Sequence, residues 1–300
     1  MEVSILGCRG SYPVASSDVL RYGGDTTCVQ IQADGQFILL DAGTGIRHVH
    51  GLPDGVGAVH MFITHLHWDH IIGFPLFPAL QRPDITLHIY SLERSHDRFY
   101  AALQQSMSRP LVGREWNDMV VNFQFHELSP GAVVALTNDL YVTCALANHP
   151  YRALGYRVQH GAQALAFIPD TAPFDRYLFE DDIVFKETPL TPNERAQLET
   201  RYEAILALTE SADWLIYDAA LTPAEYEALP HWGHSTMPQA VAMARAAEVG
   251  ELIFFHHNPT RTDEQIDALL AEQRAAHPDL YLAAAYAGMR LGGNGLRHED

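Results

Sequence analysis

Residues 64–70 read THLHWDH, and this stretch decides how the rest of the sequence is interpreted. The apolar residues 61–63 in front of it, MFI, are typical of a buried strand. Three histidines and an aspartate therefore follow a strand end, and imidazole and carboxylate are ligands of Zn²⁺ and other borderline divalent ions. A loop leaving a strand can turn all four side chains toward one point. His65 and His67 would then serve one ion, and Asp69 and His70 a second.

Further ligands are expected where other apolar runs end. Four side chains cannot complete two metal sites of four or five ligands each. The runs before His149, Asp170 and His256 are apolar and strand-like. Each of these residues is a weak candidate alone, since a lone histidine is more often structural or merely exposed.

Strand-like and helix-like runs alternate along the chain without a repeat or a low-complexity linker. The chain has 300 residues, 47% of them hydrophobic, which is enough for a large core. Residues 191–194, TPNE, form a capping-box pattern that predicts a helix start. We expect one mixed α and β domain over residues 1–300, with two packed sheets covered by helices. Helices are expected after His70, after residue 191, at 238–249 and at 263–275, and strands at 3–6, 28–33, 37–41, 59–64, 85–90, 121–127, 140–147, 154–159, 164–168, 251–255 and 280–286.

The charge balance disfavours long nucleic acids as partners. Nineteen basic and 37 acidic residues give a net charge of −18, which repels a phosphate backbone. A small anion is less affected, because it feels the local field of a metal site. The three cysteines are far apart and form no CxxC pair, so a reducing cytoplasm is expected. With no apolar run of ~18–20 residues and no basic n-region, we expect neither a membrane span nor a secretory signal.

The THLHWDH loop resembles the HxHxDH signature of the metallo-β-lactamase superfamily. Other segments are similar, in order and spacing, to its phosphodiesterase branch, which includes ribonuclease Z and small cyclic-phosphodiester hydrolases. The resemblance covers nearly the whole chain and implies an α+β fold, a four-layer αββα sandwich with metals at one edge. A homodimer is expected by analogy. The matching segments are 7–13 (GCRGSYP), 39–43 (LLDAG), 64–70, 149 with 155–158 (GYRV), 166–171 (AFIPDT), 233–236 (GHST) and 252–259 (LIFFHHNP).

The resemblance also implies a complete ligand set for two ions, most simply zinc, with manganese or iron as alternatives. One ion would be held by His65, His67 and His149, the other by Asp69, His70 and His256, with Asp170 bridging both. Two alternatives stay open, namely His257 in place of His256 and Asp218 in place of Asp170. If Asp170 is the bridge, Asp41 and Asp218 are expected to accept hydrogen bonds from ligand imidazoles.

Two residues are predicted to be catalytic, Asp69 and His234. In the resembling phosphodiesterases a histidine at the position of His234 contacts the scissile phosphate and assists the leaving group. The alternative for His234 is a histidine at a helix start with a local hydrogen bond. The implied reaction is attack on phosphorus by a hydroxide that bridges the two ions.

The expected substrate is a small or cyclic phosphodiester. Ribonuclease Z often has a long tRNA-binding arm between the third histidine and the bridging aspartate, whereas about twenty residues separate His149 from Asp170 here. Residues 171–212 are predicted to form a lid, or else a packed surface insertion. Arg9, Arg21 and Arg157 are candidate phosphate contacts. The alternatives are a carbonyl hydrolase (lactonase, thioesterase or β-lactamase-like) and a non-catalytic metal-binding sensor or scaffold, the latter disfavoured because no expected ligand is missing.

Overall fold

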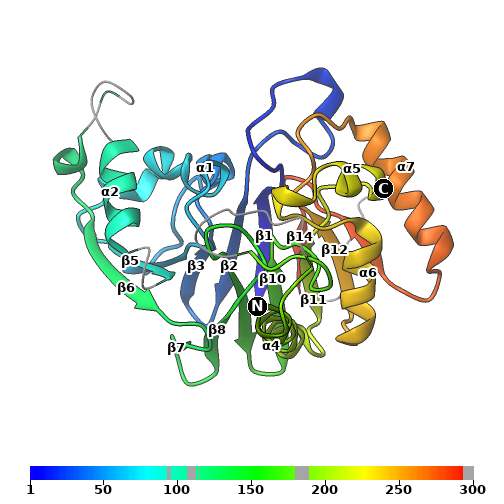
Figure 1. Ribbon diagram of the computed structural model, residues 1–300. Coiled ribbons are helices and arrows are strands. Elements are labelled where there is room, and N and C mark those ends of the chain that lie inside the picture. The colour runs from blue at the N-terminus through cyan, green and yellow to red at the C-terminus, as the bar shows by residue number, and fades with distance from the viewer. Residues whose placement is uncertain (93–95, 107–112, 114, 180–188, 293–300) are drawn as a thin grey trace. The chain divides into compact units, whose positions relative to one another are not determined.

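The chain divides into two compact units, each built on one seven-stranded sheet. The computed structural model describes residues 1–92, 96–106, 113, 115–179 and 189–292. The first unit comprises residues 1–129 with 286–300, and the second comprises residues 130–285 (Figure 1). The prediction that residues 1–300 form a single domain stays a prediction.

The sheet of the first unit has the strand order β14-β1-β2-β3-β4-β5-β6. Strands β3 to β6 are parallel, whereas β14, β1, β2 and β3 pair antiparallel. Leu40 of β3 pairs with Phe62 of β4, so the residues after both strands emerge at the same edge. The strands are β1 (Glu2–Gly7), β2 (Cys28–Ala33), β3 (Gln36–Leu40), β4 (Ala58–Phe62), β5 (Thr86–Leu92), β6 (Asn122–Leu128) and β14 (Arg290–Leu291).

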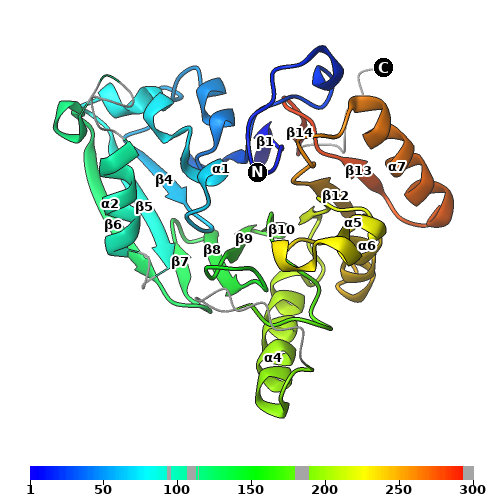
Figure 2. The ribbon, with the colours of Figure 1, turned by 45° about the horizontal axis from the view of Figure 1, so that its top comes forward.

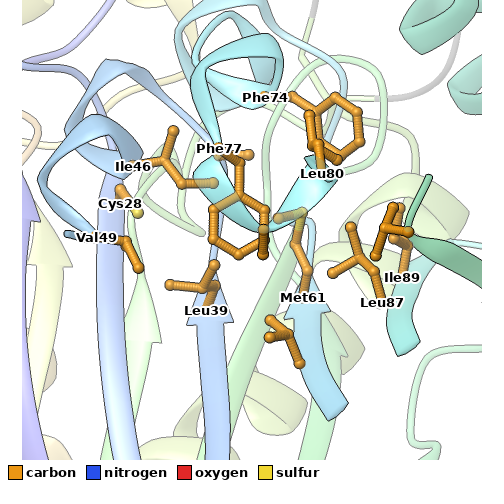
Figure 3. Close-up of a cluster of buried hydrophobic side chains, with 14 of the residues drawn as sticks. Cys28, Leu39, Ile46, Val49, Met61, Phe74, Phe77, Leu80, Leu87 and Ile89 are labelled. Carbon is orange, nitrogen blue, oxygen red and sulfur yellow. The ribbon is translucent and has the colours of Figure 1, made fainter. Parts of the chain in front are cut away.

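Short helical turns follow β4 and are anchored by the core of this unit. Helix α1 (Trp68–Ile71) is followed by the 3₁₀ turns η3 (Phe74–Leu76) and η4 (Pro78–Gln81), and α2 (His96–Ser106) lies against β5 and β6. Figure 3 shows Phe74 and Phe77 from these turns among the side chains of Leu39 and Met61. Burying one such phenylalanine contributes roughly 1.5–3 kcal/mol. The core therefore anchors the segment that carries Asp69 and His70.

The helix expected after His70 is wrong in its position. Helix α1 begins at Trp68 and ends at Ile71, so it contains His70 instead of following it. The chain cannot continue as an α-helix because Pro75 and Pro78 lack the amide hydrogen that a helix interior needs. Two 3₁₀ turns form there instead.

Three histidines stack across neighbouring strands of the same sheet. The ring of His60 on β4 lies 4.8 Å from that of His88 on β5, which lies 5.2 Å from that of His126 on β6. Nδ1 of His88 is 2.9 Å from Nε2 of His126, and Nδ1 of His60 is 3.1 Å from the Tyr90 hydroxyl. The sequence indicated no such grouping, because these residues meet through strand register.

The sheet of the second unit has the order β13-β12-β11-β10-β9-β8-β7. Strands β10 to β13 are parallel and β7 to β10 are antiparallel. The central parallel strands are buried on both faces, as their apolar runs require. The strands are β7 (Val133–Ala135), β8 (Leu140–Leu146), β9 (Leu154–His160), β10 (Gln163–Ile168), β11 (Trp214–Asp218), β12 (Glu251–Phe255) and β13 (Leu282–Ala284).

The register of this sheet brings four chain segments to one edge. Ile168 of β10 pairs with Tyr217 of β11, and Asp218 pairs with Phe255 of β12, so these three strands end together. The β8–β9 loop returns at the same edge, because Phe167 pairs with Tyr156 near the start of β9. In open α/β sheets, ligands bind at such carboxyl ends of parallel strands.

Four helices of the second unit begin with a capping box. They are α4 (Pro192–Thr209), α5 (Pro223–Ala228), α6 (Met237–Ala246) and α7 (Asp263–Ala276), and each has a threonine N-cap whose side chain accepts from the third helical amide. A Glu or Gln at that third position bonds back to the cap. In Figure 2, α5, α6 and α7 lie together beside β12 and β13. Helix α4 contacts β8 and β9, α6 contacts β11 and β12, and α7 contacts β13.

The strands that were expected agree closely with the observed ones, whereas β7, β11, β14, α2 and α5 were not expected. Predicted strand ends fall within about two residues of the observed ends, and the capping box predicted at residues 191–194 is confirmed. Part of the predicted lid, residues 180–188, lies outside the described residues, while α4 occupies much of its second half. No described helix is long and apolar enough to cross a membrane.

Candidate metal centre

The first group of predicted ligands lies directly after β4. The ring of His65 is 4.4 Å from that of His67 and 4.3 Å from that of His70. Oδ2 of Asp69 is 3.5 Å from Nε2 of His70. Two atoms that bind one tetrahedral ion at 2.0–2.1 Å lie about 3.4 Å apart. The spacing of Asp69 and His70 therefore suits a shared ion, as their chemistry does.

Asp41 and Thr64 orient the rings of this group. His70 Nδ1 lies 2.7 Å from Asp41 Oδ2, and the Thr64 amide and hydroxyl donate to Asp41 Oδ1 at 2.8 and 3.0 Å. His65 Nδ1 is 3.1 Å from the Thr64 hydroxyl. With both Nδ1 atoms turned to these partners, Nε2 is the nitrogen of each ring that would bind a metal. Burial raises the pKa of the Asp41 carboxyl, although the hydrogen bonds from His70 and Thr64 act in the opposite direction.

Left-handed backbone conformations occur beside the ligands. Asp41 has φ 61°, Ser11 has φ 61° and His256 has φ 59°. Such conformations are unfavourable for residues other than glycine and cluster at functional sites. The turn at Ser11 lets its amide donate to Asp69 Oδ2 at 2.7 Å. Ser11 and Thr64 were not predicted as site residues, although each lies in a segment that matched the family pattern.

The second group of predicted ligands surrounds Asp170, just beyond β10. Asp170 Oδ1 lies 3.4 Å from Nε2 of His256, and its Oδ2 lies 3.7 Å from Nε2 of His149. The two carboxylate oxygens thus face two different imidazoles, which is the arrangement that a bridging carboxylate requires. Asp170, His234 and His256 offer ligand atoms that all lie within 4.8 Å of one another.

Gly233 determines the orientation of His149. Nδ1 of His149 donates to the Gly233 carbonyl at 2.7 Å, which directs Nε2 toward Asp170. Gly233 has φ 80°, and a Cβ there would lie 2.3 Å from Pro150 Cδ and 2.9 Å from His149 Nδ1. Only glycine fits this close approach.

The contacts of Asp218 and His257 bear on the two alternative ligands. Asp218 accepts from the Thr171 amide at 2.9 Å, from the Ala220 amide at 3.0 Å and from His234 Nδ1 at 2.8 Å. These contacts suit a hydrogen-bond acceptor better than a bridge. Nε2 of His257 lies 2.8 Å from the Ala285 carbonyl. The geometry thus favours Asp170 over Asp218 and His256 over His257.

Asn148 anchors the start of the segment that was predicted as a lid. Its buried side chain donates to the carbonyls of Pro173 and Tyr177 at 2.8 and 2.7 Å and accepts from the Phe179 amide at 3.1 Å. Three hydrogen bonds therefore hold residues 173–179 beside the loop of His149. The sequence carried no specific signal for this role.

The three arginines proposed to contact phosphate have other partners. Arg9 is fully buried, and its Nε donates to the Gly23 carbonyl at 2.8 Å. Arg157 donates to the carbonyls of Leu208 and Glu210 at the end of α4, where a cation also suits the helix dipole. Arg21 lies over the ring of Tyr22. These contacts give Arg9 and Arg157 structural roles.

Both groups of side chains fit divalent metal ions. They offer imidazole nitrogens and carboxylate oxygens, the donor set of Zn²⁺, Mn²⁺ and Fe sites. Within each group the measured spacings between ligand atoms match those of one shared ion. Partners on Nδ1 orient His70 and His149, as metal-binding histidines require.

Comparisons with known proteins agree with this chemistry. A family model described as the β-lactamase superfamily domain matches residues 36–185, which include the THLHWDH loop, His149 and Asp170. The chain is 29% identical to ribonuclease BN of Enterobacter sp. (strain 638), over 94% of this chain and 97% of that protein.

Solved structures show the same fold. The chain resembles human tRNase Z, short form, with a TM-score of 0.64 and 18% identity, over 97% of this chain and 99% of that one. It also resembles a diphosphatase from the PhnP family with a TM-score of 0.62 and 18% identity, over 98% of both chains. The predicted αββα fold of metallo-β-lactamase type is thereby confirmed. The chain belongs to the metallo-β-lactamase superfamily and is a metal-dependent hydrolase that is similar in sequence to ribonucleases BN and Z.

Proposed function

We propose that this chain hydrolyses small or cyclic phosphodiesters at a centre of two divalent ions, with zinc as the preferred metal. One ion would be bound by His65, His67 and His149 and the other by Asp69, His70 and His256, with Asp170 as the bridge. Asp69 and His234 would be the catalytic residues. The substrate itself would be small, and residues 171–212 would cover it as a lid.

The geometry of Asp170 carries the proposal of two ions. Its two oxygens face different histidines, at 3.4 Å for His256 and 3.7 Å for His149. A ligand of a single ion needs to direct only one oxygen at it. In the first unit, the donor pair His65 and His67 is followed along the same loop by the pair Asp69 and His70, as two ions would need.

A pair of divalent ions supplies a nucleophile at neutral pH by lowering the pKa of water, and it neutralises phosphate charge. The protein residues orient the donors and move a proton. His70 is held by Asp41, and Asp69 accepts from the Ser11 amide. These contacts fix the ligand atoms before substrate arrives, so that little reorganisation is needed.

His234 distinguishes the phosphodiesterase proposal from carbonyl hydrolysis. Its Nδ1 lies 2.8 Å from Asp218 Oδ2, so the aspartate accepts from Nδ1–H and orients the ring. Protonated at both nitrogens, the ring would offer Nε2–H to the departing oxygen of a phosphodiester, a contribution of typically 10²–10⁴-fold. Residues 233–236, GHST, resemble the element that carries this histidine in phosphodiesterases, so we infer that a phosphodiester is the better substrate class.

An RNA substrate is the second candidate, because two relatives that match 94% of this chain are named ribonuclease BN and ribonuclease Z. The net charge of −18 opposes binding of a long polyanion. The homodimer and the cytoplasmic location stay predictions.

Metal content and a substrate panel test the proposal. The panel contains bis-p-nitrophenyl phosphate, 2′,3′-cyclic AMP, a tRNA precursor, a lactone and a β-lactam. We expect two ions per chain and turnover of the phosphodiesters. Asp170→Ala should lose metal and activity together, whereas His234→Ala should keep the metal and lose 10²–10⁴-fold in kcat. Turnover of the lactone alone, or full metal content in Asp170→Ala, would contradict the proposal.

A further inference from the structure

A cavity in the second unit lies between α4 and the strands β8 and β9. Its volume is about 770 Å³, within the roughly 300–1,000 Å³ that is usual for sites of small molecules. Its described lining residues all fall within residues 130–208, and the candidate metal ligands are not among them. The cavity therefore belongs to a single compact unit and is distinct from the candidate metal centre.

The packing of α4 explains why this cavity is open. Ile205 and Leu208 of α4 are buried, and a Cβ placed on Gly155 of β9 would lie 3.3 and 3.4 Å from their side chains. These two residues therefore hold α4 against β9. Toward β8 the helix presents Ala204 and Ala207, which line the cavity and whose short side chains do not fill it.

The lining between α4 and β8 is mainly apolar and is elongated. Ala145 and Leu146 of β8 lie on one side, and Ala204, Ala207 and Leu208 of α4 lie on the other. Residues of α4 line the cavity from position 197 to position 208, which is roughly 16 Å at 1.5 Å per residue. An extended alkyl chain fits a groove of this shape, and its burial there is favourable because apolar surface leaves water.

Charge distinguishes this lining from the rest of the chain. Its described residues include Arg157 and Arg201 and no Asp or Glu, whereas the whole chain has 37 acidic and 19 basic residues. A cleft lined by one sign of charge concentrates ligands of the opposite sign. The cavity is therefore suited to a ligand with an apolar body and an anionic group.

Arg157 is fixed at the end of the cavity where α4 ends. Its Nη1 donates to the carbonyls of Leu208 and Glu210 at 3.0 and 2.8 Å, and its Nε donates to Gln159 Oε1 at 3.0 Å. Nη2 takes part in none of these three hydrogen bonds. Its two N–H groups suit one carboxylate, and a guanidinium already held in place loses little freedom when it binds a ligand.

We propose that this cavity, here called the α4 groove and lined by Ala145, Arg157, Arg201, Ala204 and Ala207 among others, binds an amphipathic carboxylate of the fatty-acid type. The carboxylate lies on Nη2 of Arg157, and the alkyl chain runs along Ala204 and Ala207. A phosphate monoester is a poorer ligand, because its two charges and three free oxygens need more donors than Nη2 offers. The ligand differs in class from the phosphodiester of the proposed function, and its binding needs no metal ion.

Calorimetry on the metal-loaded protein tests the proposal with octanoate, acetate, 1-octanol and octyl phosphate. We expect one octanoate to bind per chain, and we expect weaker binding of acetate, which lacks the alkyl chain, and of 1-octanol, which lacks the charge. Arg157→Gln should weaken octanoate binding roughly 10- to 100-fold, as for the loss of a hydrogen bond to a charged group. The same variant should bind 1-octanol as the wild-type protein does, which would show that the groove stays intact.

Ala204→Trp fills the α4 groove, and Ala196→Trp is its matched control. Both alanines are exposed on α4, but Ala196 lies outside the lining, so only Ala204→Trp takes up the space of the ligand. We expect Ala204→Trp to abolish octanoate binding and Ala196→Trp to retain it. Equal binding in the two variants would place octanoate elsewhere, such as on the metal ions, and would overturn the proposal.

Other occupants of the α4 groove give different results. Tighter binding of octyl phosphate than of octanoate would identify a phosphate ligand and contradict the proposal, as would equal binding of octanoate and 1-octanol. If a second copy of this chain filled the groove, Ala204→Trp would lower the sedimentation coefficient and octanoate would not bind, which also counts against it. Because binding and not turnover is measured, failure of the proposed function leaves the outcome of this test unaffected.

Discussion

Replacing Gly233 by alanine should disorganise the His149 ligand far more than a comparable substitution elsewhere. Gly233 has φ 80°, where any L-residue costs about 1–2 kcal/mol. Its added Cβ would lie 2.3 Å from Pro150 Cδ and 2.9 Å from His149 Nδ1, so one of them must move. Overpacking of this kind costs ~1–3 kcal/mol. Losing the hydrogen bond between His149 and the Gly233 carbonyl adds ~0.5–1.5 kcal/mol.

Gly131→Ala is the matched control for this substitution. Gly131 has φ 86° in the same unit, and a Cβ there meets nothing within 4 Å. Gly131→Ala therefore has the cost of the left-handed backbone conformation but no steric clash. The difference between the two variants should be about 1.5–4.5 kcal/mol in the free energy of unfolding of the metal-free protein, measured in urea. Metal affinity should also fall by about 10–100-fold in Gly233→Ala, as for the loss of a contact that orients a ligand.

Equal unfolding free energies for Gly233→Ala and Gly131→Ala would refute the reasoning. So would an unchanged metal affinity in Gly233→Ala. Either result would mean that the Pro150 segment moves aside without cost and that the Gly233 carbonyl does not orient His149.

Three further predictions follow from contacts within single units. Asp41→Asn should lower metal affinity by about 10–100-fold, because its amide no longer attracts the Nδ1 proton of His70, and equilibrium dialysis measures this. Asn148→Ala should lower the free energy of unfolding by about 1.5–4.5 kcal/mol, since three hydrogen bonds of a buried side chain are lost. Burial, with the neighbouring histidines, lowers the pKa of His60 to about 4, so the unfolded chain binds more protons than the native state between about pH 6.5 and 4. The stability that comes from keeping His60 neutral is present above pH 6.5 and is lost as the pH falls, by about 2–3 kcal/mol at pH 4.5. His60→Gln should remove this loss, which urea unfolding at pH 7 and at pH 4.5 would measure.

Each of these has a result that counts against it. Unchanged metal affinity in Asp41→Asn would show that Thr64 alone orients the rings. A loss below about 0.5 kcal/mol in Asn148→Ala would show that water replaces the side chain at residues 173–179. An identical pH dependence in His60→Gln and the wild-type protein would assign the acid sensitivity to other groups.

Local patterns in the sequence predicted much of the fold and the candidate ligands. Apolar runs marked eleven of the described strands within about two residues, because burial on both faces of a central strand requires continuous apolar sequence. The capping box at Thr191 marked the start of α4 for a similarly local reason. Histidines and aspartates at strand ends marked the candidate donors, because strands of one sheet can end at a common edge.

Local patterns failed where the geometry depended on residues distant in the sequence. The helix expected after His70 begins three residues earlier, at Trp68, and it ends at Ile71 because two prolines and the packing of Phe74 and Phe77 decide the course of the chain beyond it. Arg9 and Arg157 bind backbone carbonyls that lie far from them in the sequence, and no local pattern predicts such contacts. The stack of His60 on its neighbouring strands follows from register alone.

By itself, the sequence determined which chemical groups are available and near which strand ends they lie. The tertiary structure decided their roles. It turned His70 to Asp41, set the Gly233 carbonyl against His149, and engaged Asp218 with His234 while Asp170 faced His149 and His256. The reason is that a hydrogen bond depends on tenths of an ångström and on direction. Those are set by strand register and by close approaches between segments far apart in the chain, which no local pattern encodes.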